Sequence, residues 1–370
     1  MKSLSKLRIL FVAGTLTKGG AEKQLFYVIK SLRAAGSEVL LLSLTNGEYW
    51  QKPIEDLGVP VVWVGQNPFP VFRLLKIFLA ALKFSPNIIQ SQHFYTNLYT
   101  ALVSRILGIV DIGAIRSNVT YEMEHNKFWG TALLYVPRWL CANSCAATKI
   151  LVNLKQREKV LTLLNTIDLK NFDQLTHLEE ALAVRQADCI TVVTVARLVK
   201  AKRLDRLLKV AALLQTEKHH IQILIIGDGP ERENLDKLFH DLNLSPNTIR
   251  FLGARDDIPQ ILLQGDIFAL TSDDEGFPNA LLEAMSARLP VVTTPAGDCS
   301  NVVINGVTGY IVDFDDITMM AERILFLSCN PMLRKHMGNN GRVSIEKNYS
   351  LDQLHSRLLE MYGCVLDKSF

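Results

Sequence analysis

Glu275 and Glu283 are two carboxylates whose spacing fits a ligand that carries hydroxyl groups at both of its ends. An ionised carboxylate accepts hydrogen bonds and cannot donate them, so each acid suits a pair of sugar hydroxyls. Helix rules alone leave a second interpretation open, in which Glu275 caps a helix and Glu283 faces solvent.

The residues between these two acids predict a helix start that can hold an anion. Pro278 suits the first helical position, because its missing N–H costs nothing there. The amides that follow would be unpaired at the positive end of the helix dipole, which favours a phosphate. They belong to Asn279, Ala280 and Leu281. Hydroxyl groups at both ends with phosphate between them describe a nucleotide sugar.

Predicted strands position this helix start. Ile267–Leu270 is a short apolar run before it, and Pro290–Thr294 is a second strand candidate after it. A further predicted strand, Ile190–Val195, leads into Arg197 and Lys202. Their guanidinium and ammonium groups could neutralise a diphosphate without a metal. A solvated basic turn is the alternative.

The segment from Glu275 to Met285 reads Glu-Gly-Phe-Pro-Asn-Ala-Leu-Leu-Glu-Ala-Met. It resembles the Glu-x7-Glu signature of the retaining GT-B glycosyltransferases of family 4, and the resemblance covers nearly the full chain. It implies that the first Glu holds hydroxyls of the donor sugar and that the second, Glu283, holds the ribose. It also places Gly276 and Phe277 in the donor site.

The same resemblance gives roles to other residues of the second half. Arg197 and Lys202 match the family's phosphate pair, although Arg203 stands where the family usually has glycine. Backbone near Gly253 and Arg255 is expected to contact the nucleotide base.

In the first half, Gly19 and Gly20 follow a predicted strand, Arg8–Ala13. Two glycines alone indicate only a strand–helix turn, but Gly-Gly-Ala-Glu resembles the family's first loop, which faces the donor phosphates and the acceptor. His93 follows another predicted strand, Asn87–Ser91. A lone histidine is more often structural, and this one resembles the family's histidine near the reacting sugar.

Short apolar strands alternate with helical stretches, which predicts an α/β fold with parallel sheets. The resemblance implies GT-B architecture, with two Rossmann-like domains facing an interdomain cleft. Residues 1–168 are expected to bind the acceptor and residues 169–349 the nucleotide sugar, while a helix within about 350–370 packs back on the first domain. Asn165–Asp168 resembles the family's linker, which we expect to continue to about Asp188.

These features predict a metal-independent retaining glycosyltransferase that uses a nucleotide sugar, with UDP-sugars the commonest in the family. Glu275, His93, Lys202 and Arg197 are the candidate catalytic residues, and no residue is an obvious covalent nucleophile. The resemblance implies attack on the same face of the sugar, with the leaving phosphate taking the acceptor proton. The acceptor is either a lipid-linked saccharide or a small molecule, in polysaccharide, glycolipid or small-molecule glycoside synthesis.

Two other classes of protein are weighed against this function. A catalytically silent nucleotide-sugar binder is expected to have lost Glu275, Lys202 or His93, and all three are present. A dinucleotide oxidoreductase would carry the Gly-x-Gly-x-x-Gly fingerprint, which is missing after the first strand. We expect no cofactor and no metal.

Composition limits the partners and the location. The net charge of +3 is too small to indicate nucleic-acid binding, and no apolar run reaches membrane-spanning length. Met1–Leu7 is too short and polar for a signal peptide. Six scattered cysteines are typical of reduced core thiols in a cytosolic protein.

Peripheral membrane contact stays open as an alternative for this cytoplasmic protein. Pro70–Phe84 predicts a basic amphipathic helix, which can lie on the inner face of a membrane. A helix packed on a sheet is the preferred interpretation. Tyr121–Leu140 is rich in aromatic residues, which suit an acceptor surface, a membrane surface or a core.

Overall fold

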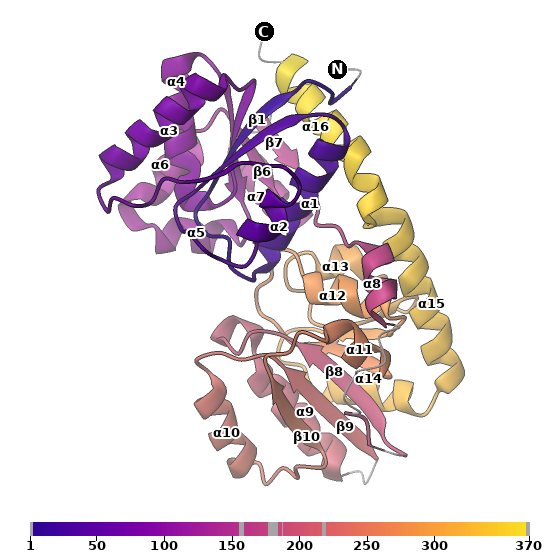
Figure 1. The fold of residues 1–370 in the computed structure, drawn as a ribbon. Coiled ribbons are helices and arrows are strands. Elements are labelled where there is room, and N and C mark those ends of the chain that lie inside the picture. The colour runs from indigo at the N-terminus through magenta and orange to yellow at the C-terminus, as the bar shows by residue number, and fades with distance from the viewer. Residues whose placement is uncertain (1–2, 155–158, 177–183, 187, 217–219, 368–370) are drawn as a thin grey trace. The chain divides into compact units, whose positions relative to one another are not determined.

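The computed structural model describes the 370-residue chain apart from residues 1–2, 155–158, 177–183, 187, 217–219 and 368–370 (Figure 1). The fold is α/β with parallel sheets. The chain divides into two compact units. The first comprises Met1–Thr166 together with Leu351–Phe370, and the second comprises Ile167–Ser350.

The first unit contains a parallel sheet with the strand order β3-β2-β1-β4-β5-β6-β7. Its strands are β1 Arg8–Ala13, β2 Glu38–Ser43, β3 Val61–Trp63, β4 Ile88–Ser91, β5 Val110–Ile115, β6 Trp139–Ala142 and β7 Val160–Thr162. Its α-helices are α1 Gly20–Ala34, α2 Gln51–Glu55, α3 Pro70–Phe84, α4 Asn97–Leu107, α5 Val119–His125, α6 Gly130–Tyr135, α7 Cys145–Asn153 and α16 Leu354–Asp367. Short 3₁₀ turns are η1 Phe94–Thr96, η2 Lys127–Trp129 and η5 Leu351–Gln353.

The second unit contains a parallel sheet with the order β10-β9-β8-β11-β12-β13. Its strands are β8 Ile190–Val195, β9 Ile221–Ile226, β10 Ile249–Gly253, β11 Ile267–Leu270, β12 Val291–Thr293 and β13 Gly309–Ile311. Its helices are α8 Leu169–Thr176, η4 Lys200–Lys202, α9 Leu204–Thr216, α10 Arg232–Asp241, α11 Ile258–Leu263, α12 Asn279–Ser286, α13 Cys299–Val302, α14 Ile317–Ser328 and α15 Pro331–Asn348.

Each sheet reverses its strand order at one point. In the first sheet the reversal lies between β1 and β4, and in the second it lies between β8 and β11. Both pairs of strands are neighbours and parallel, so their carboxyl ends meet at one edge of the sheet. Open α/β sheets bind ligands at this kind of reversal, which makes the two edges the first places to look for a site.

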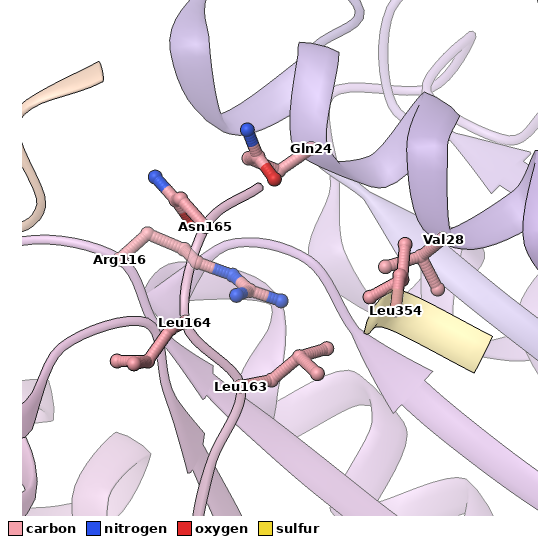
Figure 2. Close-up of a pocket in the computed structure, with 7 residues that line it drawn as sticks. All are labelled: Gln24, Val28, Arg116, Leu163, Leu164, Asn165 and Leu354. Carbon is pink, nitrogen blue, oxygen red and sulfur yellow. The ribbon is translucent and has the colours of Figure 1, made fainter. Parts of the chain in front are cut away.

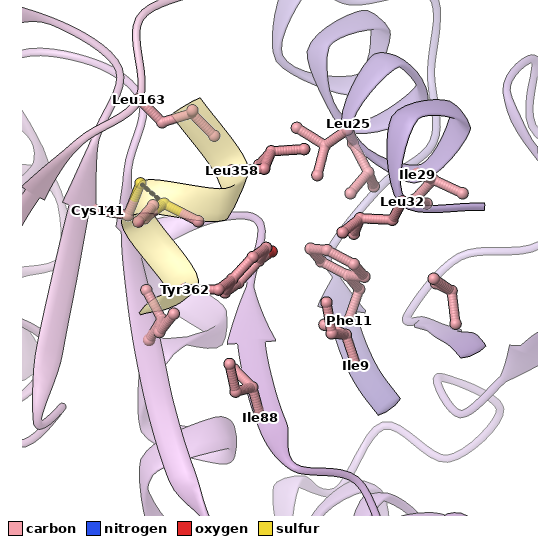
Figure 3. Packing of buried hydrophobic residues seen from close by; sticks show 14 of the residues in the cluster. Ile9, Phe11, Leu25, Ile29, Leu32, Ile88, Cys141, Leu163, Leu358 and Tyr362 are labelled. Carbon is pink, nitrogen blue, oxygen red and sulfur yellow. Dashed lines mark hydrogen bonds between the residues drawn. The ribbon is translucent and has the colours of Figure 1, made fainter. Parts of the chain in front are cut away.

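The core of the first unit is completed by the last helix of the chain. Tyr362 on α16 is fully buried beside Phe11 of β1 and helix α1 (Figure 3). Its hydroxyl donates to Gln90 Oε1 at 2.6 Å, and the Cys141 thiol contacts Met361 Sδ at 3.8 Å. Burial raises the pKa of Tyr362 well above its usual value, so the phenol stays protonated.

The predicted linker to Asp188 was wrong over its first part, because residues 169–176 form helix α8. Phe172 is buried, and the two carboxylate oxygens of Asp173 each accept a hydrogen bond from Arg342 of α15 at 2.7 Å. A polar sequence therefore forms an ordered element when one apolar residue and one ion pair fasten it. Residues 177–183 and 187 of the predicted linker lie outside the described part of the chain.

Candidate functional site

Lys202 and Glu275 meet at the point where the second sheet reverses. Lys202 follows β8, Glu275 follows β11, and the Lys202 ammonium lies 2.6 Å from Glu275 Oε1. The Glu275 side chain is 7% exposed and that of Lys202 is 20% exposed. A cation and an acid that lie 73 residues apart in the sequence, with three strands between them, are thus brought together at the edge where open α/β sheets bind ligands.

Three further bonds join the two loops that carry this pair. The Asp273 amide donates to the Ala201 carbonyl at 2.9 Å, and the Thr271 hydroxyl donates to the Lys202 carbonyl at 3.0 Å. Arg203 donates to Asp273 at 2.9 Å. The position of the Lys202 backbone is therefore set by residues next to Glu275, not by the Lys202 side chain alone.

Arg203, which replaces the family's usual glycine, adopts the left-handed backbone conformation with φ of +44°. A residue with a Cβ is disfavoured there, whereas glycine is not. The cost is offset by ion pairs, because the guanidinium binds Asp205 and Asp273, both at 2.9 Å. The turn thus keeps the geometry that glycine would allow and gains a tie to the Glu275 loop.

Ser272 and Gly297 also shape the surroundings of Glu275, and sequence reasoning missed both roles. The Ser272 hydroxyl donates to Glu275 Oε1 at 2.7 Å. Gly297 has φ of +53°, and a Cβ there would collide with the Glu275 carbonyl oxygen. The only signal in the sequence was position, since each residue lies in a loop that follows a predicted strand.

The helix α12 begins at Asn279, with Pro278 as its N-cap, so the prediction that Pro278 is the first helical residue was wrong by one position. The Leu281 amide donates to the Pro278 carbonyl at 3.1 Å, inside the first turn. The amides of Asn279 and Ala280 are the better placed candidates for an anion. Gly276 and Phe277 precede the helix, and the Phe277 side chain is buried.

The remaining predicted donor residues lie around the same sheet. Arg197 is an exposed residue two positions after β8, and Glu283 is half-buried on α12. Gly253 ends β10, and the Arg255 guanidinium binds the Asp257 carboxylate, with its Nε 2.8 Å from Oδ1. Lys202 and Glu275 are in direct contact, whereas Arg197, Gly253 and Arg255 mark neighbouring strand ends.

His93 occupies the corresponding edge of the first sheet, between β1 and β4. The Gly14 amide donates to His93 Nδ1 at 3.0 Å. Nδ1 is therefore the acceptor and Nε2 carries the proton, which points to Glu22 Oε1 at 3.3 Å. The Thr15 hydroxyl donates to the same oxygen at 2.7 Å.

The predicted glycines of the first loop explain how Glu22 reaches this position. Gly19 is the N-cap of α1 and Gly20 its first residue. A Cβ on Gly19 would collide with the Glu22 carboxylate. Gly19 therefore lets a buried acid approach the loop backbone, a role for Glu22 that the sequence did not reveal.

Substitution of Glu22 tests this cluster through its pH dependence. Burial alone would raise the pKa of Glu22, but hydrogen bonds from His93 and Thr15 outweigh it, and the pKa is lowered. The ionised acid therefore stabilises the fold above its unfolded pKa, and this stability is lost as pH falls through the lower folded pKa. We expect Glu22→Gln to lower the free energy of unfolding by about 1 kcal/mol at neutral pH. We also expect the free energy of unfolding of this variant to fall less steeply as the pH is lowered into the acid range.

Urea unfolding at neutral pH and near pH ~4 measures both effects, since that pH lies close to the unfolded pKa of a carboxyl group. The exposed Glu55 gives a matched control, Glu55→Gln. If acid lowers the free energy of unfolding of Glu22→Gln as much as it does that of the parent chain, the role of this cluster is contradicted.

Comparison with known proteins places the edge of the second sheet in a family. Residues 183–344 match the family described as Glycosyl transferases group 1, a range that contains both Lys202 and Glu275. The matched segment is a group 1 glycosyltransferase domain, and the chain is a glycosyltransferase. Its described fold is that of GT-B glycosyltransferases.

Curated relatives of this glycosyltransferase are enzymes of several pathways. N-acetyl-alpha-D-glucosaminyl L-malate synthase of Bacillus anthracis is 27% identical over 58% of this chain and 56% of that protein. The capsular polysaccharide biosynthesis glycosyltransferase CapM of Staphylococcus aureus is 29% identical over 80% of this chain and 81% of its own length.

Among solved structures, Anabaena HepE in complex with UDP and glucose superposes with a TM-score of 0.82. The two chains are 21% identical, and the match covers 96% of this glycosyltransferase and 99% of HepE. At this identity the likeness establishes the fold.

Cys299 is a buried thiol that interacts electrostatically with Glu275. Burial, with the Glu275 carboxylate adding to it, raises the pKa of Cys299 to about 12. A thiol that stays protonated is a poor nucleophile, so Cys299 contributes packing and not a covalent step. All six cysteines are described and free of disulfide bonds.

A small pocket in the first unit lies beside Arg116, which follows β5 (Figure 2). Gln24 and Asn165 form its polar side and leucine residues its apolar side. The Arg116 guanidinium reaches Gln92 Oε1 at 3.4 Å. The pocket is too small for a sugar, and its lining includes none of the predicted site residues.

Asp273 and Asp274 are adjacent acids, a residue type that can bind a metal ion. Asp273 instead binds Arg203 at 2.9 Å and Arg206 at 2.5 Å. Within the described parts of the chain, no three His, Cys, Asp or Glu side chains gather as ligands of one ion.

Proposed function

We propose that the glycosyltransferase moves a sugar from a nucleotide-diphosphate donor, a UDP-sugar in the first instance, to an acceptor hydroxyl with retention of configuration. The bond between the anomeric carbon and the phosphate oxygen breaks, and a bond to the acceptor oxygen forms on the same face. The acceptor proton passes to the departing phosphate. The same-face course rests on the family resemblance.

The contact between Lys202 and Glu275 is the observation that carries this proposal. An acid held by Lys202 and Ser272 at a strand end has a fixed orientation, which suits it to sugar hydroxyls. The ammonium group lies beside it, where it can stabilise the negative charge that develops on a leaving diphosphate. The amides of Asn279 and Ala280 add neutral donors for the same charge.

A UDP-sugar donor is supported by the fold neighbour HepE, which was solved with UDP and glucose. For the acceptor, the relatives support a chemical class and not a particular compound. CapM acts in capsular polysaccharide biosynthesis, and the Bacillus anthracis synthase is named for an L-malate product, so saccharide and small-molecule acceptors both occur among relatives. We assign the acceptor to the first unit, with His93 on its side of the reaction.

Metal independence is proposed on the charge available in the second unit. Lys202, beside Glu275, and the exposed Arg197, which follows β8, supply two cations, and Asp273 is neutralised by arginines. No step then requires a divalent ion to balance the diphosphate. A silent nucleotide-sugar binder is the alternative, and only turnover separates the two.

A transfer assay with purified chain and a panel of nucleotide sugars tests the proposal. We expect the donor that binds to raise the melting temperature, because it binds the folded state, and to release its nucleotide on transfer. EDTA should leave that rate unchanged, and the product anomer should match the donor's. Binding without turnover would establish the silent binder, and a rate abolished by EDTA and restored by Mn²⁺ would refute metal independence.

The location of the glycosyltransferase belongs to the same proposal. Across the described residues, no helix is both long and apolar enough to cross a membrane. We propose that the first unit makes a peripheral contact with a membrane, and the cytoplasmic location predicted from the cysteine pattern stays a prediction.

A further inference from the structure

Helix α3 of the first unit packs on the core by one face, where Leu74, Phe78, Ala80 and Phe84 are partly buried, and its opposite face is also apolar. Ile77 and Ala81 are its buried residues. Its outer apolar side chains are between 51% and 73% exposed, and they are Val71, Phe72, Leu75, Leu79 and Leu82. Exposed apolar residues that gather on one face of a helix mark a surface for interaction.

The exposed residues form one continuous surface. With about 100° between successive residues, these five side chains fall within an arc of about 100° on the side opposite Ile77. The helix covers the 15 residues of Pro70–Phe84, a length of about 22 Å. We call this surface the α3 outer face. In Figure 1, α3 lies at the margin of its unit, with α4 beside it.

A row of cations borders the α3 outer face on one side. Lys83, Lys76 and Arg73 follow Phe72 around the helix in that order. Arg73 donates to the Asn67 carbonyl at 2.9 Å, and Lys76 binds the Gln66 side chain, so both partners are neutral. The helix contains no Asp or Glu, and within the described residues no ion pair is formed by these three cations.

Neighbouring residues enlarge the apolar surface without adding negative charge. Phe69 precedes α3, is exposed, and contacts the Phe72 ring with centroids 6.4 Å apart. Helix α4 contacts α3 and exposes Leu102, Ile106 and the cation Arg105, again with no acid in its sequence.

We propose that the α3 outer face is the surface by which the first unit lies on an anionic phospholipid membrane. The inference rests on the proposed peripheral contact and names its site and its partner. The apolar arc would enter the boundary between headgroups and acyl chains, while Arg73, Lys76 and Lys83 meet lipid phosphates from its edge. An acidic surface is selected, because a border of three cations without a carboxylate attracts anions.

Sedimentation with vesicles of phosphatidylcholine and phosphatidylglycerol tests this surface with the full chain. We expect binding that weakens with salt and with removal of phosphatidylglycerol. Leu75→Ser with Leu79→Ser should lower the partition coefficient at least about tenfold, because two exposed leucines no longer enter the bilayer. Lys76→Gln and Lys83→Gln should each lower it about fivefold.

Matched controls separate the α3 outer face from apolar exposure in general. Met332 and Val343 are exposed on α15 in the second unit, so Met332→Ser with Val343→Ser should bind vesicles like the parent chain. Melting temperatures of all variants check that each is folded.

Three results would overturn the inference. They are vesicle binding that Leu75→Ser with Leu79→Ser leaves intact, binding that is equal on neutral vesicles, and a dimer that this double variant abolishes while vesicles are ignored. The last would assign the face to a second copy of the chain. Release of nucleotide from the nucleotide-sugar panel, with soluble and lipid-linked acceptors, is measured in parallel: its absence with intact vesicle binding refutes the proposed function and leaves the surface standing.

Discussion

Glu275→Gln is expected to lower kcat by about 10²- to 10³-fold while nucleotide binding is largely retained. The carboxylate accepts hydrogen bonds from Lys202 and Ser272 and has further lone pairs for sugar hydroxyls. Glutamine is nearly the same size, but its NH₂ group can accept nothing, and it no longer pairs with the Lys202 charge. The sugar would then lose its fixed orientation, and the reaction would slow because its rate depends on that orientation.

The same variant leaves the rest of the proposed donor-binding site in place. Glu283 and the start of α12 are unaltered, and Lys202 becomes available to the diphosphate. We therefore expect UDP to bind Glu275→Gln about as tightly as the parent chain. Steady-state kinetics and calorimetric titration with UDP measure the two quantities separately.

Ser272→Ala is the matched control for Glu275→Gln, because it removes one hydrogen bond and keeps the carboxylate. We expect a smaller decrease in kcat, and the same UDP affinity. Unchanged turnover in Glu275→Gln would remove Glu275 from the mechanism, whatever the fold and the family indicate.

Tyr362→Ala is expected to lower the free energy of unfolding of the first unit by about 3–5 kcal/mol. Tyr362 is fully buried on α16, among residues of β1, β4 and α1 (Figure 3). Its removal leaves a cavity the size of a phenol ring and deprives Gln90 of its donor. Because α16 is fastened to this unit largely by buried side chains such as Leu358 and Val365, the helix should loosen as a whole.

Urea unfolding followed by tryptophan fluorescence measures this effect, and the two units need not unfold in one transition. Tyr362→Phe is the control: it keeps the ring and loses only the 2.6 Å hydrogen bond to Gln90, at a cost of about 1–3 kcal/mol. Equal losses in both variants would show that the hydrogen bond, and not the packing, fastens the helix.

Much of the architecture is predictable from the sequence because buried strands of parallel sheets are uninterrupted apolar runs. Arg8–Ala13 and Ile190–Val195 are strands with the predicted bounds, and Pro70–Phe84 is a helix with the predicted bounds. The strands that prediction missed are short. Trp139–Ala142 has four residues, and Val160–Thr162 and Gly309–Ile311 have three each, too few to show any periodicity.

The sequence predicts which loops of the site meet, but it does not predict which of their atoms form bonds. Lys202 and Glu275 each follow a predicted strand, so their approach at one sheet edge could be expected once the strand order was assumed. That they form an ion pair depends on the Ser272 hydroxyl and on Arg203, which adopts a backbone conformation that favours glycine. Such contacts are set by tertiary packing, which cannot be predicted from local sequence.

The return of α16 to the first unit has a consequence for how the chain is made. A ribosome releases residues in order, so the 184 residues of Ile167–Ser350 emerge before the helix that completes the earlier core. The later half can thus become native while the earlier one still lacks Leu354, Leu358 and Tyr362. Until α16 is released, the apolar residues that pack against it are exposed to solvent, where a chaperone can bind them.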